Sequence, residues 1–226
     1  FYAFSTKILV HIEAGHITMV AAFSLFPLVF LSIRKILTDF RPKWLAICSI
    51  TLALMYFCYP TIFYYSLIFI SLYWAYSILI ARKFPTLYLV RSSFLFLSIV
   101  VLTVLIAAIE LLPHLEFAPM STRSQLKLED IALPLWNFKK FAVSLLFPYL
   151  EKNLNHEAFL YIGLVPAVLS VIGFLTLTKI KKIVFFSGTF FMLLYVSGLS
   201  TPVFPTLYNF LPLLNYSRIT TRPWFI

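Results

Sequence analysis

Long, unbroken runs of apolar residues recur along this chain, separated by short stretches that hold nearly all of its charged residues. Each run is close to the roughly 20 apolar residues that a helix needs to cross a bilayer. The runs are continuous rather than alternating in polarity, which favours helices over the strands of a membrane barrel. The pattern predicts an all-α fold, a polytopic integral membrane helix bundle. We expect six spans, at Ile17–Ile33, Trp44–Tyr59, Thr61–Ala81, Ser93–Leu112, Phe159–Thr178 and Ile183–Leu199.

The second and third runs meet at Tyr59-Pro60. Proline disfavours helical geometry in the residue before it, so we predict a tight hairpin there. A single kinked helix from Trp44 to Ala81 would be far longer than a bilayer is thick.

Composition supports a lipid environment for the 226 residues. Hydrophobic residues make up 62% of the chain and charged residues 12%, and the mean hydropathy is +0.95. A soluble domain carries about 25% charged residues, so this chain lacks the polar groups to cover a globule. Cys48 and Cys58 lie about 15 Å apart along one predicted helix, which is too far for a disulfide.

The basic residues indicate how the bundle is oriented. Loops 34–43, 82–92 and 179–182 hold four, three and three of them, which is ten of the 18 lysines and arginines. Short loops rich in lysine and arginine face the cytoplasm, so we expect these three on that side. The net charge of +10 is then explained by topology and by contact with anionic lipids. It does not indicate nucleic-acid binding, for which no motif is present.

The opposite, non-cytoplasmic side gathers different chemistry. Seven of the eight acids and all four histidines fall there: His11, Glu13, His16, Glu110, His114, Glu116, Glu129, Asp130, Glu151, His156 and Glu157. The connection 113–158 is predicted to be a non-cytoplasmic loop. Within it, Leu135–Phe147 has the pattern of an interfacial helix lying flat on the membrane. We expect residues 1–226 to form a single transmembrane domain and, since they open on Phe1 without a methionine, to be an internal fragment of a longer chain.

Several catalytic motifs are absent from the sequence. It contains no phosphate-binding glycine loop, no His-Glu-x-x-His, no Cys-x-x-Cys and no Gly-x-Ser-x-Gly. ATP-driven transport, zinc proteolysis and serine hydrolysis therefore gain no support.

Glu13-Ala14-Gly15-His16, at the outer mouth of the first span, is the first candidate site. Gly15 would let a chain or ligand approach closely, and His16 could bind an anionic head group or a metal. The alternative, which these residues alone favour, is an ordinary helix entrance with an interfacial histidine.

Glu110, His114 and Glu116 form the second candidate site. If the helix continues past Pro113, Glu110 and His114 share one face at i, i+4 spacing. A carboxylate beside an imidazole suits general-base or metal-binding duty. The alternative is a kinked helix end with solvated charges, but an acid in the last apolar turn calls for a reason.

Arg218 and Arg222, also four residues apart, form the third candidate. Arginine binds phosphate with two parallel hydrogen bonds, so a lipid phosphate at the outer leaflet would be a natural partner. The alternative is a pair of arginines that extend to the membrane surface.

Eight segments, taken in order along the chain, carry a resemblance to a known family. They are Gly15-His16, Phe26–Leu28, Cys58–Tyr65, Glu110–Pro113, Ser121–Ser124, Leu146–Tyr149, Tyr161–Pro166 and Phe210–Arg218 with Arg222. Together they resemble the YfhO-like bacterial membrane proteins, which belong with the GT-C-type polytopic glycosyltransferases. The resemblance covers nearly the whole chain, in motifs that are mostly apolar.

The resemblance implies an enzyme that takes a sugar from a polyprenyl-phosphate donor. It would transfer that sugar, outside the cytoplasm, to a cell-envelope glycan or lipid. In this family an acid in the first outer loop acts as base or metal ligand, and that loop would precede Phe1. The resemblance therefore leaves the main catalytic acid and any divalent cation unassigned. It makes Arg218, Arg222 and His16 the donor-phosphate contacts, and Glu110, His114 and Glu116 the candidates at the acceptor or metal site.

Two other readings stay open. A flippase or transporter subunit for lipid-linked precursors would also need outward arginines and a lipid groove. A non-catalytic membrane assembly protein is the third possibility.

Overall fold

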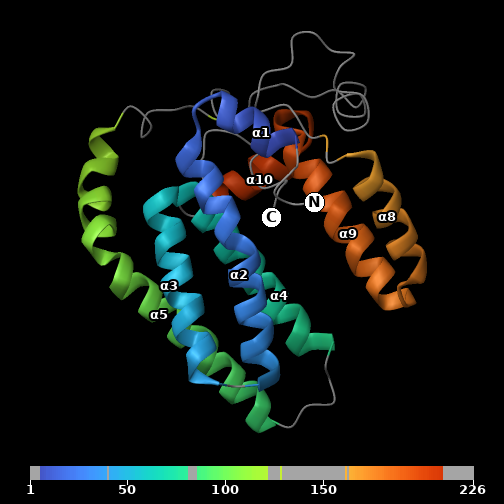
Figure 1. The fold of residues 1–226 in the computed structure, drawn as a ribbon, viewed down its shortest axis with the longest axis horizontal. Coiled ribbons are helices and arrows are strands. Elements are labelled where there is room, and N and C mark those ends of the chain that lie inside the picture. The colour runs from blue at the N-terminus through green and yellow to red at the C-terminus, as the bar shows by residue number, and fades with distance from the viewer. Residues whose placement is uncertain are drawn as a thin grey trace. The chain divides into compact units, whose positions relative to one another are not determined.

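The computed structural model describes residues 6–39, 41–80, 86–121, 128, 161 and 163–210. Every secondary-structure element in these ranges is helical (Figure 1), which confirms the all-α part of the prediction. The helices are α1 (Thr6–Glu13), α2 (Ile17–Asp39), α3 (Pro42–Cys58), α4 (Pro60–Ile80), α5 (Thr86–Phe117), α8 (Leu164–Thr176), α9 (Lys179–Val196) and α10 (Val203–Phe210), with three-residue 3₁₀ turns at Ala118–Met120 (η2) and Gly198–Ser200 (η6).

Three stretches of the described chain are long and apolar enough to cross a membrane, judged by length and composition. They are Ile17–Asp39, Pro60–Ile78 and Leu87–Met120, and α3 and α8 are shorter apolar helices. The structure therefore has the features of a membrane protein, with a helix over most of each predicted run.

The chain divides into two compact units. Thr18–Met120 makes up almost all of one, here called the four-helix unit because it contains α2 to α5. Phe1–Ile17 and Ser121–Phe225 make up the other, here called the second unit.

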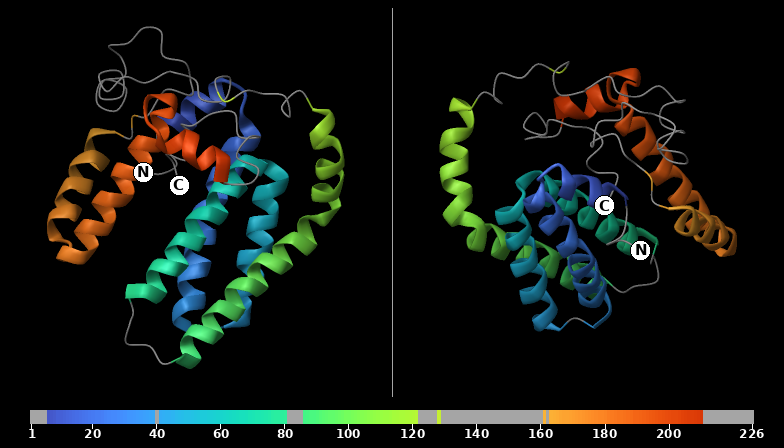
Figure 2. Two further views of the ribbon diagram at one scale, coloured as in Figure 1. Left: turned by 180° about the vertical axis from the view of Figure 1, so that it is seen from behind. Right: turned by 45° about the horizontal axis from the view of Figure 1, so that its top comes forward.

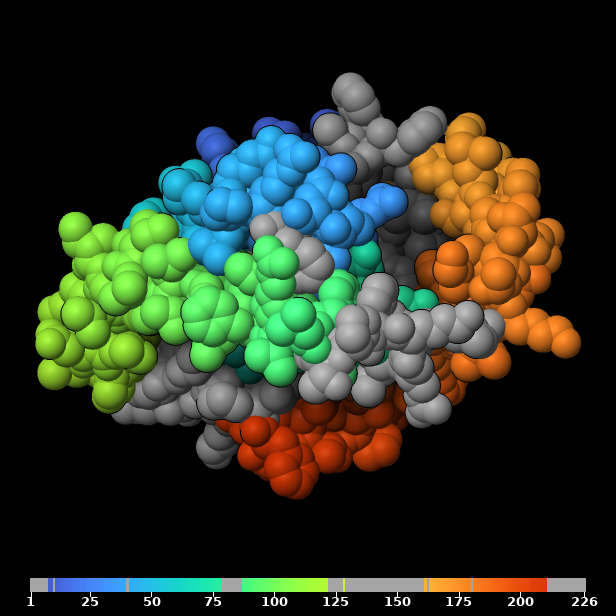
Figure 3. All heavy atoms as spheres, turned by 90° about the horizontal axis from the view of Figure 1, so that it is seen from below, coloured from blue at the N-terminus to red at the C-terminus, as the bar shows by residue number. Residues whose placement is uncertain are grey.

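Helices α2 to α5 run in alternating directions (Figures 1 and 2). The end of α2, the start of α3 and the start of α5 therefore lie at one end of the unit, and the junction of α3 with α4 lies at the other. Figure 3 views the first of these ends, where the start of α5 lies against the junction of α2 and α3. The Tyr88 hydroxyl of α5 donates a hydrogen bond to the Leu37 carbonyl of α2 there, at 3.0 Å.

The predicted hairpin between the second and third runs is confirmed. Tyr59 adopts an extended conformation (φ −161°, ψ 98°) and ends α3, while its N–H donates to the Met55 carbonyl at 2.8 Å. Pro60 then begins α4, a position where its missing N–H costs nothing.

Small residues line the contact between α3 and α5. The Ser49 hydroxyl donates to the Ile99 carbonyl and the Thr103 hydroxyl donates to the Ser49 carbonyl, each at 3.4 Å. One turn further along each helix, Ala53 and Ala107 are 0% and 2% exposed. Small residues four apart allow two membrane helices to approach closely, and hydroxyl groups then bond across the gap.

Aromatic rings join α4 to its other neighbours. The ring of Phe30 on α2 lies 5.0 Å from that of Tyr73 in an edge-on arrangement. Trp74 stacks on Phe96 of α5, again with 5.0 Å between ring centroids. Such pairs add specific geometry to the burial of apolar surface.

In the second unit, α8 and α9 form an antiparallel pair (Figures 1 and 2), with Phe174 and Phe185 in ring contact at 5.7 Å. The lysines predicted to form the loop 179–182 lie instead in the first turn of α9, because the link is only Leu177 and Thr178. Beyond α9, α10 packs back through an edge-on contact of Phe204 with Tyr195.

Several predicted helix ends are wrong. The first span continues past Ile33 to Asp39, and the fourth begins at Thr86 rather than Ser93 and continues past Leu112 to Phe117. Much of the predicted loops 34–43 and 82–92 is therefore helical. Hydropathy marks where apolar residues stop, whereas the backbone hydrogen bonds of a helix continue into polar sequence. The predicted interfacial helix at 135–147 lies outside the described residues.

Candidate functional site

Helix α5 continues through Pro113, and this fulfils the condition on which the second candidate site depended. Glu110 and His114 consequently lie one turn apart on one face. The His114 Nε2 atom is 3.7 Å from the Glu110 Oε1 atom, and the two side chains are 50% and 35% exposed. The pair is therefore open to its surroundings on one side.

Tyr56 of α3 completes the cluster. Its hydroxyl group lies 2.9 Å from Nδ1 of His114, within hydrogen-bond distance. The tyrosine itself is only 6% exposed and shares a buried cluster with Ala53 and Ala107. The ring of Phe63 packs edge-on against it, with centroids 5.4 Å apart. A rigid, buried phenol thus holds one nitrogen of a half-exposed imidazole.

The close α3–α5 contact explains why these residues meet. Ser49, Ala53 and Tyr56 follow one another along the face of α3 that contacts α5. Their partners on α5 follow in the same order, Thr103, Ala107 and then His114, because the two helices run in the same direction (Figure 1). Because small residues bring the two backbones together below, the tyrosine hydroxyl can reach the imidazole above.

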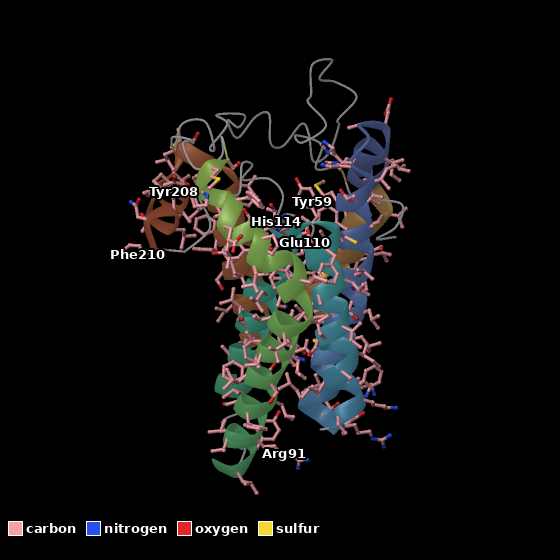
Figure 4. All side chains as sticks on the ribbon, turned by 90° about the vertical axis from the view of Figure 1, so that its left-hand side faces the viewer. Tyr59, Arg91, Glu110, His114, Tyr208 and Phe210 are labelled. Atoms are coloured by element: carbon pink, nitrogen blue, oxygen red, sulfur yellow. The ribbon has the colours of Figure 1, made fainter. Side chains whose placement is uncertain are left out.

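The cluster of Tyr56, His114 and Glu110 lies toward the end of α5 that is opposite Arg91 (Figure 4). Figure 4 shows Arg91 near one end of α5 and Glu110 with His114 toward the other, at the level of Tyr59. Arg91 and Glu110 are 19 residues apart, which is about 28 Å along a helix. The hydrocarbon core of a bilayer is about 30 Å thick. If α5 spans a membrane, the two charges therefore lie near its two borders.

Glu116, the third predicted residue of this site, is not part of the cluster. It is exposed, and two positions beyond His114 correspond to about 200° around the helix. In the described ranges, no group of three or more His, Cys, Asp or Glu side chains could hold a metal ion. The structure thus brings two of the three predicted residues together, with Tyr56 in place of the third.

Gly15 and His16 form a helix-ending turn in the second unit. The Gly15 N–H donates to the Ile12 carbonyl and the His16 N–H donates to the His11 carbonyl, at 3.0 and 2.8 Å. With Gly15 at φ 80°, this is the Schellman pattern. Among the described residues, no atom lies within 4 Å of where a Gly15 Cβ atom would be, so no described segment of the chain makes the close approach that this glycine would allow. Its role is the left-handed turn that ends α1.

The imidazole of His16 lies beside that of His11, with ring centroids 5.5 Å apart. His16 belongs to a different compact unit from Glu110 and His114. The predicted phosphate contacts Arg218 and Arg222 lie outside the described residues.

Fold and site together define a class: an all-helical protein with helices of membrane-spanning length and a Tyr-His-Glu cluster at one end of its four-helix unit. No protein-family model, curated protein or solved structure matches the chain.

Proposed function

We propose that this protein is a multi-pass membrane glycosyltransferase. It uses a polyprenyl-phosphate-linked sugar and acts on the non-cytoplasmic face, on a cell-envelope glycan or lipid. The observation that carries the proposal is the Glu110–His114 pair, held by Tyr56 at the end of α5 opposite Arg91. A partly exposed carboxylate beside an imidazole can accept the proton of a hydroxyl group at a membrane border.

The proposal includes a topology. Six spans would cross the cell membrane, with residues 34–43, 82–92 and 179–182 at its cytoplasmic side. Support comes from the four-helix unit, where Arg34, Arg41 and Arg91 belong to the end away from the Glu110 cluster. The second unit supports it less directly, since three lysines begin α9.

Transfer of a sugar from a lipid phosphate needs two kinds of group. A base must remove the proton of the acceptor hydroxyl, and cationic groups must stabilise the phosphate that leaves. The Glu110–His114 pair would supply the first. Arg218, Arg222 and His16 would supply the second.

The test uses the protein in proteoliposomes with a panel of polyprenyl-phosphate hexoses carrying a radiolabelled sugar. Transfer of label to envelope lipid or glycan acceptors is expected for the wild type. The double variant Arg218→Ala, Arg222→Ala should abolish product formation while inserting normally. Glu116→Gln, at an exposed position outside the cluster, is the matched control for Glu110→Gln.

Two results would count against the transferase. Full activity in the arginine double variant would remove the phosphate-binding assignment. Movement of the labelled lipid across the bilayer, without transfer of its sugar, would instead identify a flippase for lipid-linked precursors.

A further inference from the structure

The two nitrogens of His114 face different partners, and this difference identifies the group that takes the proton. We propose that Tyr56 is a positioning residue that holds His114 as its Nε2–H tautomer, which leaves the Glu110 carboxylate as the proton acceptor. The second half of this inference rests on the function proposed above, whereas the tautomer does not depend on it.

The tautomer follows from the contacts on each nitrogen. A neutral imidazole has one N–H donor and one acceptor nitrogen. If Nε2 lacked the proton, its lone pair would face the Glu110 oxygen at 3.7 Å, which is repulsive. With the proton on Nε2, the imidazole directs its positive edge at the carboxylate. Nδ1 then accepts the hydrogen bond that the Tyr56 hydroxyl donates at 2.9 Å.

This arrangement leaves the imidazole poorly suited to be the base. Its lone pair at Nδ1 is already engaged by Tyr56, and Nε2 carries a proton. The Glu110 carboxylate has two oxygens and about four acceptor sites, of which the imidazole faces only one. Glu110 therefore keeps acceptor capacity that His114 has lost.

Tyr56 is suited to positioning because it is fixed while its partner is not. The phenol is 6% exposed and its ring is held by Phe63 and by the Ala53–Ala107 contact. The His114 side chain is half exposed. A rigid donor beside a freer acceptor determines the orientation of the acceptor.

In the transfer step, the oxygen of the acceptor hydroxyl forms a bond to the anomeric carbon of the sugar. The bond between that carbon and the phosphate oxygen breaks, and its electron pair stays on the polyprenyl phosphate. The proton of the acceptor hydroxyl moves to Glu110. His114 and Tyr56 exchange no proton in this step, so they act through Glu110 rather than on the substrate.

The tautomer can be measured without any substrate. The full chain, labelled with ¹⁵N-histidine in lipid nanodiscs, gives a separate NMR signature for protonated and unprotonated ring nitrogens. The chain has four histidines, so His114→Gln assigns the signal by subtraction. We expect the Nε2–H form in the wild type. Tyr56→Phe keeps the ring and removes only the donor, and should lower the ratio of Nε2–H to Nδ1–H about fivefold.

Tyr76→Phe is the matched control. Tyr76 lies on α4, about 24 Å along the helix from Pro60 and far from the cluster. Loss of its hydroxyl group should leave the His114 signal unchanged. A wild-type signal from the Nδ1–H form, or an unchanged ratio in Tyr56→Phe, would overturn the role of Tyr56. In the Nδ1–H form, the unprotonated Nε2 atom would face the Glu110 carboxylate, so that both groups could accept a bond from the same cation or donor.

Activity tests the assignment of the base separately. In the transfer assay, Glu110→Gln should lose activity, whereas His114→Gln and Tyr56→Phe should keep a reduced kcat with little change in KM. A greater loss in His114→Gln than in Glu110→Gln would overturn Glu110 as the proton acceptor. If the tautomer result holds but the wild type transfers no sugar, the proposed function fails and the tautomer assignment stands.

Discussion

Replacing Ala107 with leucine tests whether the close α3–α5 contact holds the candidate site together. Ala107 is 2% exposed and shares a buried cluster with Ala53 and Tyr56. Leucine adds three carbon atoms where the two helices are in contact. The side chain has no open space to enter, so α5 must shift away from α3 or neighbouring side chains must leave their preferred rotamers.

The expected cost follows from overpacking. Extra methylene groups in a packed interior typically destabilise by about 1–3 kcal/mol. That range corresponds to a change of about 5- to 150-fold in an equilibrium constant. The effect on the site is geometric as well. A shift of about 1 Å would lengthen the 2.9 Å contact of Tyr56 with His114 beyond hydrogen-bond distance.

Unfolding by SDS titration in mixed micelles measures the first effect, and the ¹⁵N-histidine signal of His114 measures the second. Ala46→Leu is the matched control, because Ala46 lies on the same α3 helix with an exposed side chain. We expect Ala107→Leu to lose both stability and the Nε2–H tautomer, and Ala46→Leu to lose neither. Equal stability in the two variants would refute the close-packed contact. If Ala107→Leu loses stability but the His114 tautomer is unchanged, the α3–α5 contact does not determine the geometry of the Tyr56–His114 pair.

Three further predictions concern other parts of the chain. Thr103→Val should lower the free energy of unfolding by about 0.6 kcal/mol, the average for a hydrogen bond between membrane helices, and no loss in SDS titration would contradict it. Gly163→Ala should destabilise by about 1–2 kcal/mol, because Gly163 has φ 98° and a Cβ atom would meet Pro166 at 3.2 Å. Gly173→Ala, within α8 and facing open space, should not destabilise. In a background without native cysteines, a cysteine at Glu116 should react with an impermeant maleimide in intact cells and one at Arg41 only after permeabilisation; labelling of both in intact cells would contradict the topology.

Hydropathy and backbone chemistry were sufficient to predict where helices form. Each apolar run carries a helix over most of its length, and the break at Tyr59-Pro60 follows from proline sterics alone. The ends at Asp39 and Phe117 were not predictable in the same way. Arg34 and Lys35 are good helix formers, so α2 continues through them after the apolar residues stop. The ion pair of Lys35 with Asp39 (3.6 Å) supports that last turn.

The candidate site likewise has a part that local sequence predicts and a part that depends on how the helices pack. Glu110 and His114 could be paired from spacing, because i and i+4 on one helix are neighbours whatever surrounds the helix. Tyr56 is 58 residues from His114. It lies in an apolar run, where nothing in the sequence distinguishes this tyrosine from the other residues of the span. Its contact depends on which helix packs beside which, and at what distance. A hydropathy pattern gives no information on which helices are neighbours or how close they are. In this structure, small residues on the two helices allow the backbones of α3 and α5 to approach: Ser49, Ala53, Thr103 and Ala107. The small residues of α3 and α5 are therefore as necessary to the chemistry proposed here as the carboxylate itself.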